Sequence, residues 1–202
     1  LATINMLFYQ GAAGAERVFA VLDTKPNIQE IDSSPRLEIN KGSIEFRNVS
    51  FTYPRTEDAA VKNINISIKG GSTTALVGHS GAGKSTIVNL LPRFFDPKEG
   101  KIQIDGQNIS EVSLSSLRKS ISMVTQDIML FDDTILSNIA YAKLEASQEE
   151  IKKACDFAAA SDFIENLPAS YETMIGENGI RLSGGQKQRI SIARAVLKNS
   201  PI

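Results

Sequence analysis

The chain has 202 residues, of which 42% are hydrophobic and 22% are charged, and its formal net charge is −1. This length and composition predict one globular domain, or a domain with an appendage, with enough apolar residues to form a core. The near balance of charge argues against a nucleic-acid partner, because broad nucleic-acid binding requires a basic field.

The single cysteine, Cys155, excludes an internal disulfide. Its place in an amphipathic stretch predicts a small buried side chain rather than a reactive thiol. The first residues have neither the basic start nor the sustained apolar run of a secretory signal. No stretch reaches the roughly 18 apolar residues typical of a membrane-spanning helix, so we expect the chain as given to be soluble.

The N-terminal part divides into a helix and a linker before the strand pattern begins. Residues 1–22 are predicted to be helical, and residues 23–40, with Pro26 and Pro35, are predicted to be a linker. Apolar residues then alternate over 44–53, and again over 64–68, which indicates half-buried antiparallel strands.

The remaining segments alternate between buried strands and helices. Thr74–Gly78 and Ile121–Val124 are short and continuously apolar, as expected for strands buried on both faces. Asp105–Gly106 is a tight-turn pair. Residues 137–167 are predicted to be helical, and a last helix follows Gly185. That helix is expected to place four apolar residues on one face: Ile190, Ala193, Val196 and Leu197.

The segment GHSGAGKS, Gly78–Ser85, matches the phosphate-binding loop G-x-x-x-x-G-K-[ST] between a predicted strand and a predicted helix. Gly81 and Gly83 allow the backbone to approach a phosphate chain closely, and the following helix presents its positive end to the same ligand. Lys84 is expected to reach the β- and γ-phosphates, and the Ser85 hydroxyl to bind Mg²⁺. The expected nucleotide-binding residues of this loop are Gly78, His79, Ser80, Gly81, Ala82, Gly83, Lys84, Ser85 and Thr86.

His79 is the only histidine of the chain. A role as catalytic base is one interpretation, and a contribution through the backbone alone is the other, which we favour. One histidine and one cysteine do not make a usual metal cluster. The loop by itself predicts binding of a nucleoside triphosphate and leaves the reaction open.

A second motif narrows the class. LSGGQ, Leu182–Gln186, resembles the signature motif of the ATP-binding cassette family. Between the two motifs, VTQD places Gln126 where the family has a glutamine that ligates Mg²⁺ or orients water. Before the phosphate loop, FTYP places Tyr53 where the family has an aromatic that stacks on adenine. Three further segments resemble segments of the family: RFFDPKEGKIQIDG, LFDDTILSNIAY and TMIGENG. Within the family, the chain is most similar to bacterial exporters of the lipid A flippase and multidrug type.

The resemblance implies an α/β fold: a P-loop NTPase (RecA-like) core with an antiparallel β subdomain and an α-helical signature subdomain, C-terminally incomplete. Residues 1–40 would be the end of a transmembrane domain and its linker, and residues 41–202 the cassette. Lys84 and Gln126 would be the catalytic residues present, and Ser85 and Gln126 would hold Mg²⁺. The resemblance also implies a second cassette, expected in a homodimer. The signature residues of this chain would close over the phosphate loop of that second cassette: Ser183, Gly184, Gly185 and Gln186.

The same resemblance implies an ATP-driven motor at the cytoplasmic face of the inner membrane. The motor would drive export of a lipid or amphipathic compound. Its cofactors would be ATP and Mg²⁺, and its partner would be a transmembrane domain of the same parent chain. The family's Walker B aspartate, catalytic glutamate and switch histidine do not occur here, so we expect this stretch to bind ATP but hydrolyse it negligibly, since loss of a general base costs about 10²–10⁴-fold in rate.

Several alternatives stay open at this point. The chain could be a soluble cassette ATPase not tied to transport, a phosphate-loop kinase, or a binding and dimerisation module. Tyr53 could be a core residue of a strand, Gln126 a polar loop residue and Ser183 a simple helix cap. Glu177 is either a contact to the membrane domain or a solvated carboxylate, and Lys187 and Arg189 are expected on a solvated helix face.

Overall fold

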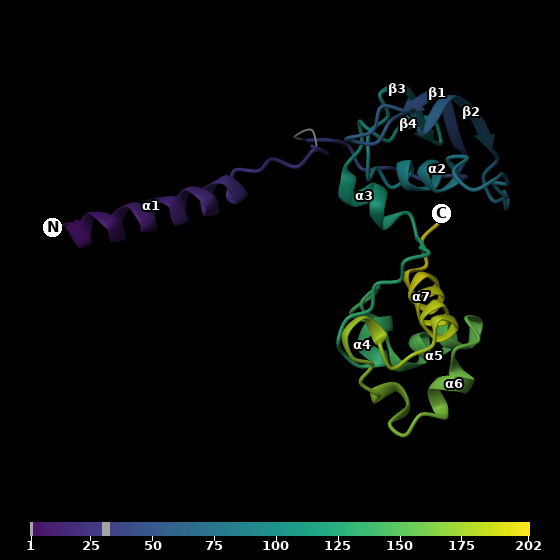
Figure 1. The fold of residues 1–202 in the computed structure, drawn as a ribbon. Coiled ribbons are helices and arrows are strands. Elements are labelled where there is room, and N and C mark those ends of the chain that lie inside the picture. The colour runs from purple at the N-terminus through teal and green to yellow at the C-terminus, as the bar shows by residue number, and fades with distance from the viewer. Residues whose placement is uncertain (1, 30–32) are drawn as a thin grey trace.

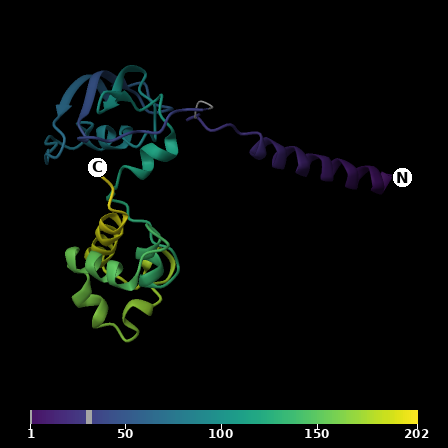
Figure 2. The same cartoon turned by 180° about the vertical axis from the view of Figure 1, so that it is seen from behind.

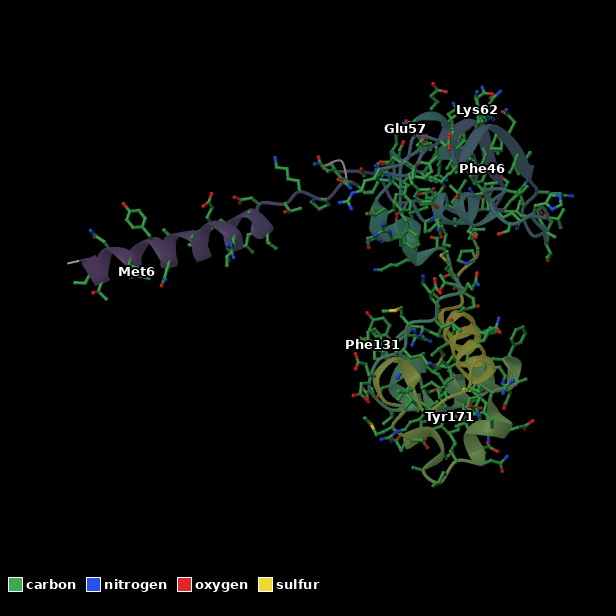
Figure 3. All side chains as sticks on the ribbon, viewed as in Figure 1. Met6, Phe46, Glu57, Lys62, Phe131 and Tyr171 are labelled. Atoms are coloured by element: carbon green, nitrogen blue, oxygen red, sulfur yellow. The ribbon has the colours of Figure 1, made fainter. Side chains whose placement is uncertain are left out.

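The computed structural model describes residues 2–29 and 33–202, which form a β lobe, a helical lobe and a separate N-terminal helix (Figure 1). This helix, α1 (Ala2–Leu22), projects away from both lobes in the front view and from behind (Figure 2). Met6 on α1 is 62% exposed, and no side chain of either lobe surrounds it (Figure 3). The helix predicted for this stretch is confirmed, and none of the described helices combines the length and the apolar character needed to cross a membrane.

An antiparallel sheet of four strands, in the order β2-β1-β3-β4, forms the β lobe. Its central strand β1 (Ile44–Phe51) pairs with β2 (Val61–Ile68) on one side and with β3 (Glu99–Ile104) on the other. Alternation along β1 buries Ile44 and Phe46 on one face, as expected for a half-buried strand.

The alternation of β1 is interrupted once. The register shifts between Phe46 and Val49, where Asn48 has a φ of 51°. Such a bulge inserts one residue into the strand and turns the following side chains. Val49 and Phe51 are therefore buried again on the core side of the sheet, which explains why the apolar spacing in this segment changes from two residues to three.

The predicted tight turn connects β3 to the short strand β4 (Gln107–Asn108). Asp105 has a φ of 46° and Gly106 a φ of 79°. Two consecutive left-handed residues are the requirement of the two-residue hairpin turn whose twist matches that of its strands. The turn prediction is confirmed.

Two short helices, α2 (Lys84–Leu90) and α3 (Leu114–Lys119), complete the β lobe (Figure 1). Phe46 lies among the side chains of this lobe (Figure 3) and is 4% exposed. The core of the lobe is apolar and draws on the linker, the sheet and both helices. It consists of Leu37, Ile44, Phe46, Val49, Phe51, Val61, Leu90, Ile102, Ile104, Ile109, Val112, Leu117 and Ile121.

The helical stretch predicted for residues 137–167 is divided into three helices. They are α4 (Ile135–Ala140), α5 (Gln148–Phe157) and α6 (Ser161–Glu165). Ser147 accounts for one of the breaks, since its hydroxyl accepts from Glu150 N and the Glu150 carboxylate accepts from Ser147 N. A capping box of this kind starts a new helix. Two 3₁₀ turns follow, at Ser170–Glu172 and Glu177–Gly179.

The last helix, α7 (Gly184–Lys198), packs against α4 and α5 and confirms the predicted face. Ile190, Ala193 and Leu197 are buried, and Val196 is half-buried. Together with residues of α4 to α6 they form a second apolar core, separate from that of the β lobe. Tyr171 lies among the side chains of this helical lobe (Figure 3).

Two predicted strands are wrong for this structure. Neither Thr74–Gly78 nor Ile121–Val124 is a strand, and Val77 is 88% exposed instead of buried. A buried strand needs hydrogen-bonded neighbours on both edges, and no described strand lies beside either segment. At Ile121 such a pairing begins, because Ile202 N donates to Ser120 O (3.1 Å) and Ser122 N donates to Ile202 O (2.7 Å).

The linker predicted over residues 23–40 is also only partly a linker. From Pro35 onward the backbone bonds to the β lobe, with Ser113 N donating to Pro35 O at 2.8 Å. Leu37 is 8% exposed and belongs to the core of the lobe. The physical reason is long-range: side chains of the β3–β4 turn and of α3 supply partners to this segment.

Candidate functional site

The phosphate loop has the backbone geometry that its glycines predict. Gly81 and Gly83 both have a φ of 81°, a region that side chains disfavour. A Cβ added at Gly83 would lie 2.7 Å from Ala60 O and 2.7 Å from Val61 Cγ1. Gly83 is therefore required twice, by its conformation and by the close approach of the chain just before β2.

Lys84 lies over the inside of this loop. Its ammonium group donates to Gly78 O (2.9 Å) and to His79 O (2.7 Å). The loop therefore holds a cation at its centre, and the His79 backbone carbonyl is one of the two acceptors. A backbone role for His79 toward a nucleotide stays a prediction. The His79 side chain is exposed.

The helix that follows presents donors to the same place. α2 begins at Lys84, and its N-cap residue Gly83 makes no side-chain cap. The amides of the first turn therefore lack a capping side chain and are available to an anion. Ser85, the next residue, is exposed.

A groove of about 630 Å³ brings Lys84, Ser85 and Gln126 together. This juxtaposition joins residues that are far apart in the sequence. The predicted role of Gln126 in binding Mg²⁺ or water stays a prediction. Asp127 lines the same groove, and among the described residues it is the one carboxylate that does so. Sequence analysis did not single out Asp127, although its position directly after Gln126 was the available signal.

Ser85 and Gln126 can hold a magnesium ion. A hydroxyl and an amide oxygen are hard ligands of the type that Mg²⁺ takes from proteins, with phosphates and water completing its shell. The described residues contain no cluster of three or more histidine, cysteine or acidic side chains placed to bind a metal. With two such ligands, the groove fits a metal ion that is bound together with a phosphate ligand.

Tyr53 is anchored on both sides. Its ring contacts Phe51 (4.9 Å between centroids, 80° between planes) and Phe95 (5.2 Å, 84°) edge to face. Its hydroxyl shares a hydrogen bond of 3.1 Å with the hydroxyl of Thr86, a buried residue of α2. Tyr53 is thus a half-buried residue that packs on the β-lobe core, and it is tied to the phosphate-loop helix. Stacking on adenine stays a prediction.

The signature turn begins α7 with a capping box. The Ser183 hydroxyl accepts from Gln186 N (3.3 Å), and Gln186 Oε1 accepts from Ser183 N (2.8 Å). The helix-cap interpretation of Ser183 is confirmed as geometry. A Cβ at Gly184 would meet no atom within 4 Å, so the turn is open to the outside.

The signature turn and the phosphate loop lie apart in this chain. The C-terminal end of α7 leads to the β lobe, so its N-terminal end points away from that lobe (Figure 1). A helix of this length spans about 22 Å. None of the signature residues lines the groove of Lys84 and Ser85, and the expected role of the signature in trans stays a prediction.

Two side chains next to the signature differ from expectation. Lys187 was expected on a solvated helix face, but its ammonium group donates to Asn178 O at 2.8 Å. Arg189 lies 5.2 Å from the centre of the Phe163 ring and is half-buried. Both residues therefore attach the start of α7 to neighbouring segments. Glu177 is exposed in its 3₁₀ turn, and its possible contact with a membrane domain stays a prediction.

Cys155 confirms the interpretation of a buried, unreactive thiol. It is fully buried in the helical core. Burial raises the pKa of Cys155 to about 11, with the Tyr171 hydroxyl opposing this and Asp156 adding to it. Since the thiolate is the reactive form, this thiol is unreactive in the folded chain at neutral pH.

The site combines a glycine-containing phosphate loop with a basic residue at the centre of that loop. The adjoining groove offers hydroxyl and amide oxygens. These features define a nucleotide-binding domain of the phosphate-loop class. The family model for ABC transporters matches residues 61–202. The chain therefore belongs to the ABC transporter family, and it is the ATP-binding cassette portion of such a protein.

Individual relatives agree with this assignment. The chain is 50% identical over its whole length to an ATP-dependent lipid A-core flippase of Syntrophus aciditrophicus and spans 33% of that protein. It is also 50% identical to the flippase of the same name from Pectobacterium atrosepticum and spans 34% of it. A solved structure of a bacterial Atm1-family ABC exporter with ATP bound matches 96% of the chain, with a TM-score of 0.92 and 45% identity, over 34% of that structure's chain. The chain thus spans about a third of the length of the relatives it matches.

Proposed function

We propose that this chain is the ATP-binding motor cassette of a membrane exporter for a lipid or another amphipathic compound. ATP would bind with Mg²⁺ in the groove of Lys84, Ser85 and Gln126, and the signature turn of a second copy would close over it. The observation that carries the proposal is the separation of the two motifs: the groove contains none of the signature residues of its own chain. A site built this way is incomplete without a partner cassette.

The residues of the groove have separate roles in the proposal. Lys84 binds the β- and γ-phosphates, and the loop amides between Gly78 and Lys84 hold the remaining phosphate oxygens. Tyr53 binds the base, where base–aromatic stacking is worth about 1–3 kcal/mol. A bound Mg²⁺ supplies neutralisation of phosphate charge, and Ser85 and Gln126 supply the oxygens that orient it.

The transmembrane domain of the full-length protein is the proposed second partner. A groove of about 350 Å³ between the lobes is lined mainly by apolar surface, and it includes Phe94 near α2 and Tyr141 after α4. Phe94 is 44% and Tyr141 60% exposed. An exposed apolar groove that touches both lobes suits a short segment of the membrane domain. We place the cassette at the cytoplasmic face of the bacterial inner membrane.

Calorimetric titration with Mg²⁺ and ATP tests the nucleotide site. Lys84→Ala is expected to weaken binding by about tenfold to a hundredfold, because a charged hydrogen-bond donor to phosphate is lost. Lys62→Ala is the matched control, since Lys62 is an exposed lysine on β2 of the same lobe (Figure 3). Its affinity should equal that of the wild type. A wild-type protein that gives no heat with ATP would refute the proposal.

The same preparation tests the partner cassette. Ser183→Arg places a bulky cation in the signature turn and should abolish ATP-dependent dimerisation, as followed by light scattering, while binding of ATP to the monomer persists. Dimerisation that survives this change would contradict the arrangement in trans. Hydrolysis by the 202-residue chain is expected to be slow, because loss of the family's general base costs about 10²–10⁴-fold in rate.

A further inference from the structure

The segment between α1 and the sheet is bonded to the β lobe at Gln29 and at several positions from Pro35 onward. The first contact is at Gln29, whose carbonyl accepts from the buried Arg93 guanidinium (3.3 Å). Arg93 is itself held by Asp96 at 2.7 Å. α1 ends at Leu22, so six residues separate α1 from this contact. A stretch of that length reaches at most about 20 Å when fully extended.

A second contact joins the segment to the first turn of α3. Ser113 N donates to Pro35 O (2.8 Å), and Leu37 N donates to the Ser116 hydroxyl (2.9 Å). The Leu37 side chain is 8% exposed in the core of the β lobe. Both the backbone and the side chain of the segment are therefore fixed at the N-terminal end of α3.

A third contact resembles one rung of a β-ladder. Glu38 N donates to the Gln107 side-chain oxygen (3.1 Å), and the Gln107 side-chain amide donates to Glu38 O (2.6 Å). The amide side chain of β4 thus pairs with the backbone of the segment in both directions. The pair adds a further attachment to the β3–β4 hairpin.

The strongest contact is the Asp105 carboxylate, which accepts five hydrogen bonds. One oxygen accepts from the backbone amides of Asn40 (2.8 Å), Lys41 (2.9 Å) and Gly42 (2.9 Å). The other accepts from the amide and the hydroxyl of Ser43, both at 2.8 Å. Hydrogen bonds to a charged acceptor are about twice as strong as neutral ones. The turn residue Asp105 therefore clamps four consecutive residues of the segment.

These contacts lead toward the nucleotide groove. α3 ends at Lys119, and the chain continues through Ile121 to Gln126, which lines the groove with Lys84. Arg118 of α3 also donates to Pro92 O (3.1 Å) and Arg93 O (3.0 Å), beside the first contact at Gln29. A displacement of the segment therefore acts on α3 at two places.

We propose that residues 35–43 are a fixed strap of the cassette, with Asp105 as its positioning residue, and that the strap delivers movement of α1 to α3 and from there to Gln126. The proposal rests on the proposed exporter function, in which α1 continues from the membrane domain. A loose tether would absorb the same movement. The strap is joined covalently to α1 and by hydrogen bonds to α3. It therefore adds a second route from membrane to nucleotide site, distinct from the groove of Phe94 and Tyr141.

Hydrogen exchange of the 202-residue chain tests the strap itself. Asp105→Asn keeps the shape of the side chain but puts an amide opposite backbone donors. The amides of residues 40–43 should then exchange about tenfold faster or more. Ser43→Ala removes one of the five bonds and should give a smaller increase at the same amides. Glu45→Gln, which removes a carboxylate of β1 paired with Arg47, is the matched control and should leave them unchanged. Unchanged exchange in Asp105→Asn would overturn the strap.

The delivery of movement is tested in the full-length protein in phosphatidylcholine vesicles. Basal ATP hydrolysis in these vesicles is compared with hydrolysis stimulated by lipid A added to the same vesicles. Asp105→Asn should leave the basal rate within about twofold of wild type, because the residue lies outside the nucleotide groove. The stimulation should fall by half or more. Full stimulation with released strap amides would overturn the delivery role.

Two further variants test whether the contact between the strap and α3 is needed for stimulation of ATP hydrolysis. Ser116→Ala removes one of the two strap hydrogen bonds at α3 and should also reduce stimulation. Ser115→Ala, which changes an exposed neighbour on the same helix, should not. Equal loss in both serine variants would count against the strap. A wild-type protein without basal ATP hydrolysis would refute the proposed function, while the exchange result would still decide whether the strap exists.

Discussion

Asp105 is the residue whose ionisation the fold perturbs most clearly. Burial raises its pKa, but the hydrogen bonds from Gly42, Lys41 and Ser43 outweigh that effect and hold the pKa far below the usual aspartate value. A carboxylate with a lowered pKa in the folded state stabilises the protein above its unfolded pKa, near 3.9. This stability is lost as the pH falls through the folded pKa.

A pH series of urea unfolding measures this contribution. The wild type should be more stable than Asp105→Asn by a constant free energy above about pH 5, and the difference should shrink steadily below about pH 4, as the unfolded wild-type chain takes up a proton that Asn cannot bind. Glu45→Gln provides the comparison, because Glu45 lies on an exposed part of the same sheet. If the difference in unfolding free energy between wild type and Asp105→Asn stays constant down to pH 2, the charge of Asp105 is not the cause of that difference.

At the scale of elements, the attachment of α7 to the segment after Gln126 depends on Asn138 and Arg194. Asn138 is fully buried in α4, and its side chain bonds Phe131 N (2.9 Å), Phe131 O (3.0 Å) and Thr134 O (3.0 Å). Arg194 of α7 donates to Asn138 O (2.8 Å), the Asn138 side-chain oxygen (3.1 Å) and Met129 O (3.0 Å). The helix that begins with the signature is thereby fixed to the loop that follows Gln126.

Asn138→Ala should destabilise the helical lobe by about 3 kcal/mol, since several buried backbone groups and a guanidinium group lose their partner together. Denaturant unfolding with an unchanged m-value measures the loss. Asn166→Ala removes an exposed asparagine of the same lobe that bonds only Asp162 O, and it should cost less than about 1 kcal/mol. Equal losses in the two variants would show that the buried network adds nothing.

At the scale of the whole molecule, two separate apolar cores predict two unfolding steps. The lobes are joined by few contacts beyond the chain itself, among them Lys198 to Arg118 O (2.7 Å), Ser200 to Lys119 O (2.9 Å) and Ser122 to Ala195 O (3.1 Å). Weakly joined cores unfold as separate cooperative units.

The single cysteine makes this prediction measurable. Cys155 lies in the helical core, so its labelling in increasing urea reports on that lobe alone. Amide exchange in β1 reports on the other lobe. The two probes should give different midpoints. Coincident midpoints would mean that the lobes unfold as one unit and would contradict the prediction.

Sequence analysis found the features that depend on neighbouring residues. The left-handed glycines of the phosphate loop, the Asp105–Gly106 turn and the Ser183 cap all follow from backbone chemistry within a few positions, and each is present in the structure. The apolar face of α7 was equally predictable, because a helix repeats its contacts every three to four residues.

The errors have one cause in common. Thr74–Gly78 and Ile121–Val124 have the composition of buried strands, yet a strand exists only beside another strand, and its neighbour cannot be inferred from its own letters. Lys187 and Arg189 look like solvated residues in a helix pattern, but the structure gives them Asn178 and Phe163 as partners. Asp127 was not singled out because only the folded chain shows that it lines the groove with Lys84.

The amino-acid sequence alone therefore determined the nucleotide-binding loop, the signature turn and the family, because these depend on short motifs whose geometry is local. The tertiary structure decided which residues share the groove, that the signature turn lies outside it, and that the linker is clamped to the β lobe. The reason is that these contacts join residues far apart along the chain. The Asp105 carboxylate, for example, accepts a hydrogen bond from Asn40, 65 positions earlier. Such pairs meet only when packing of the core brings distant segments together.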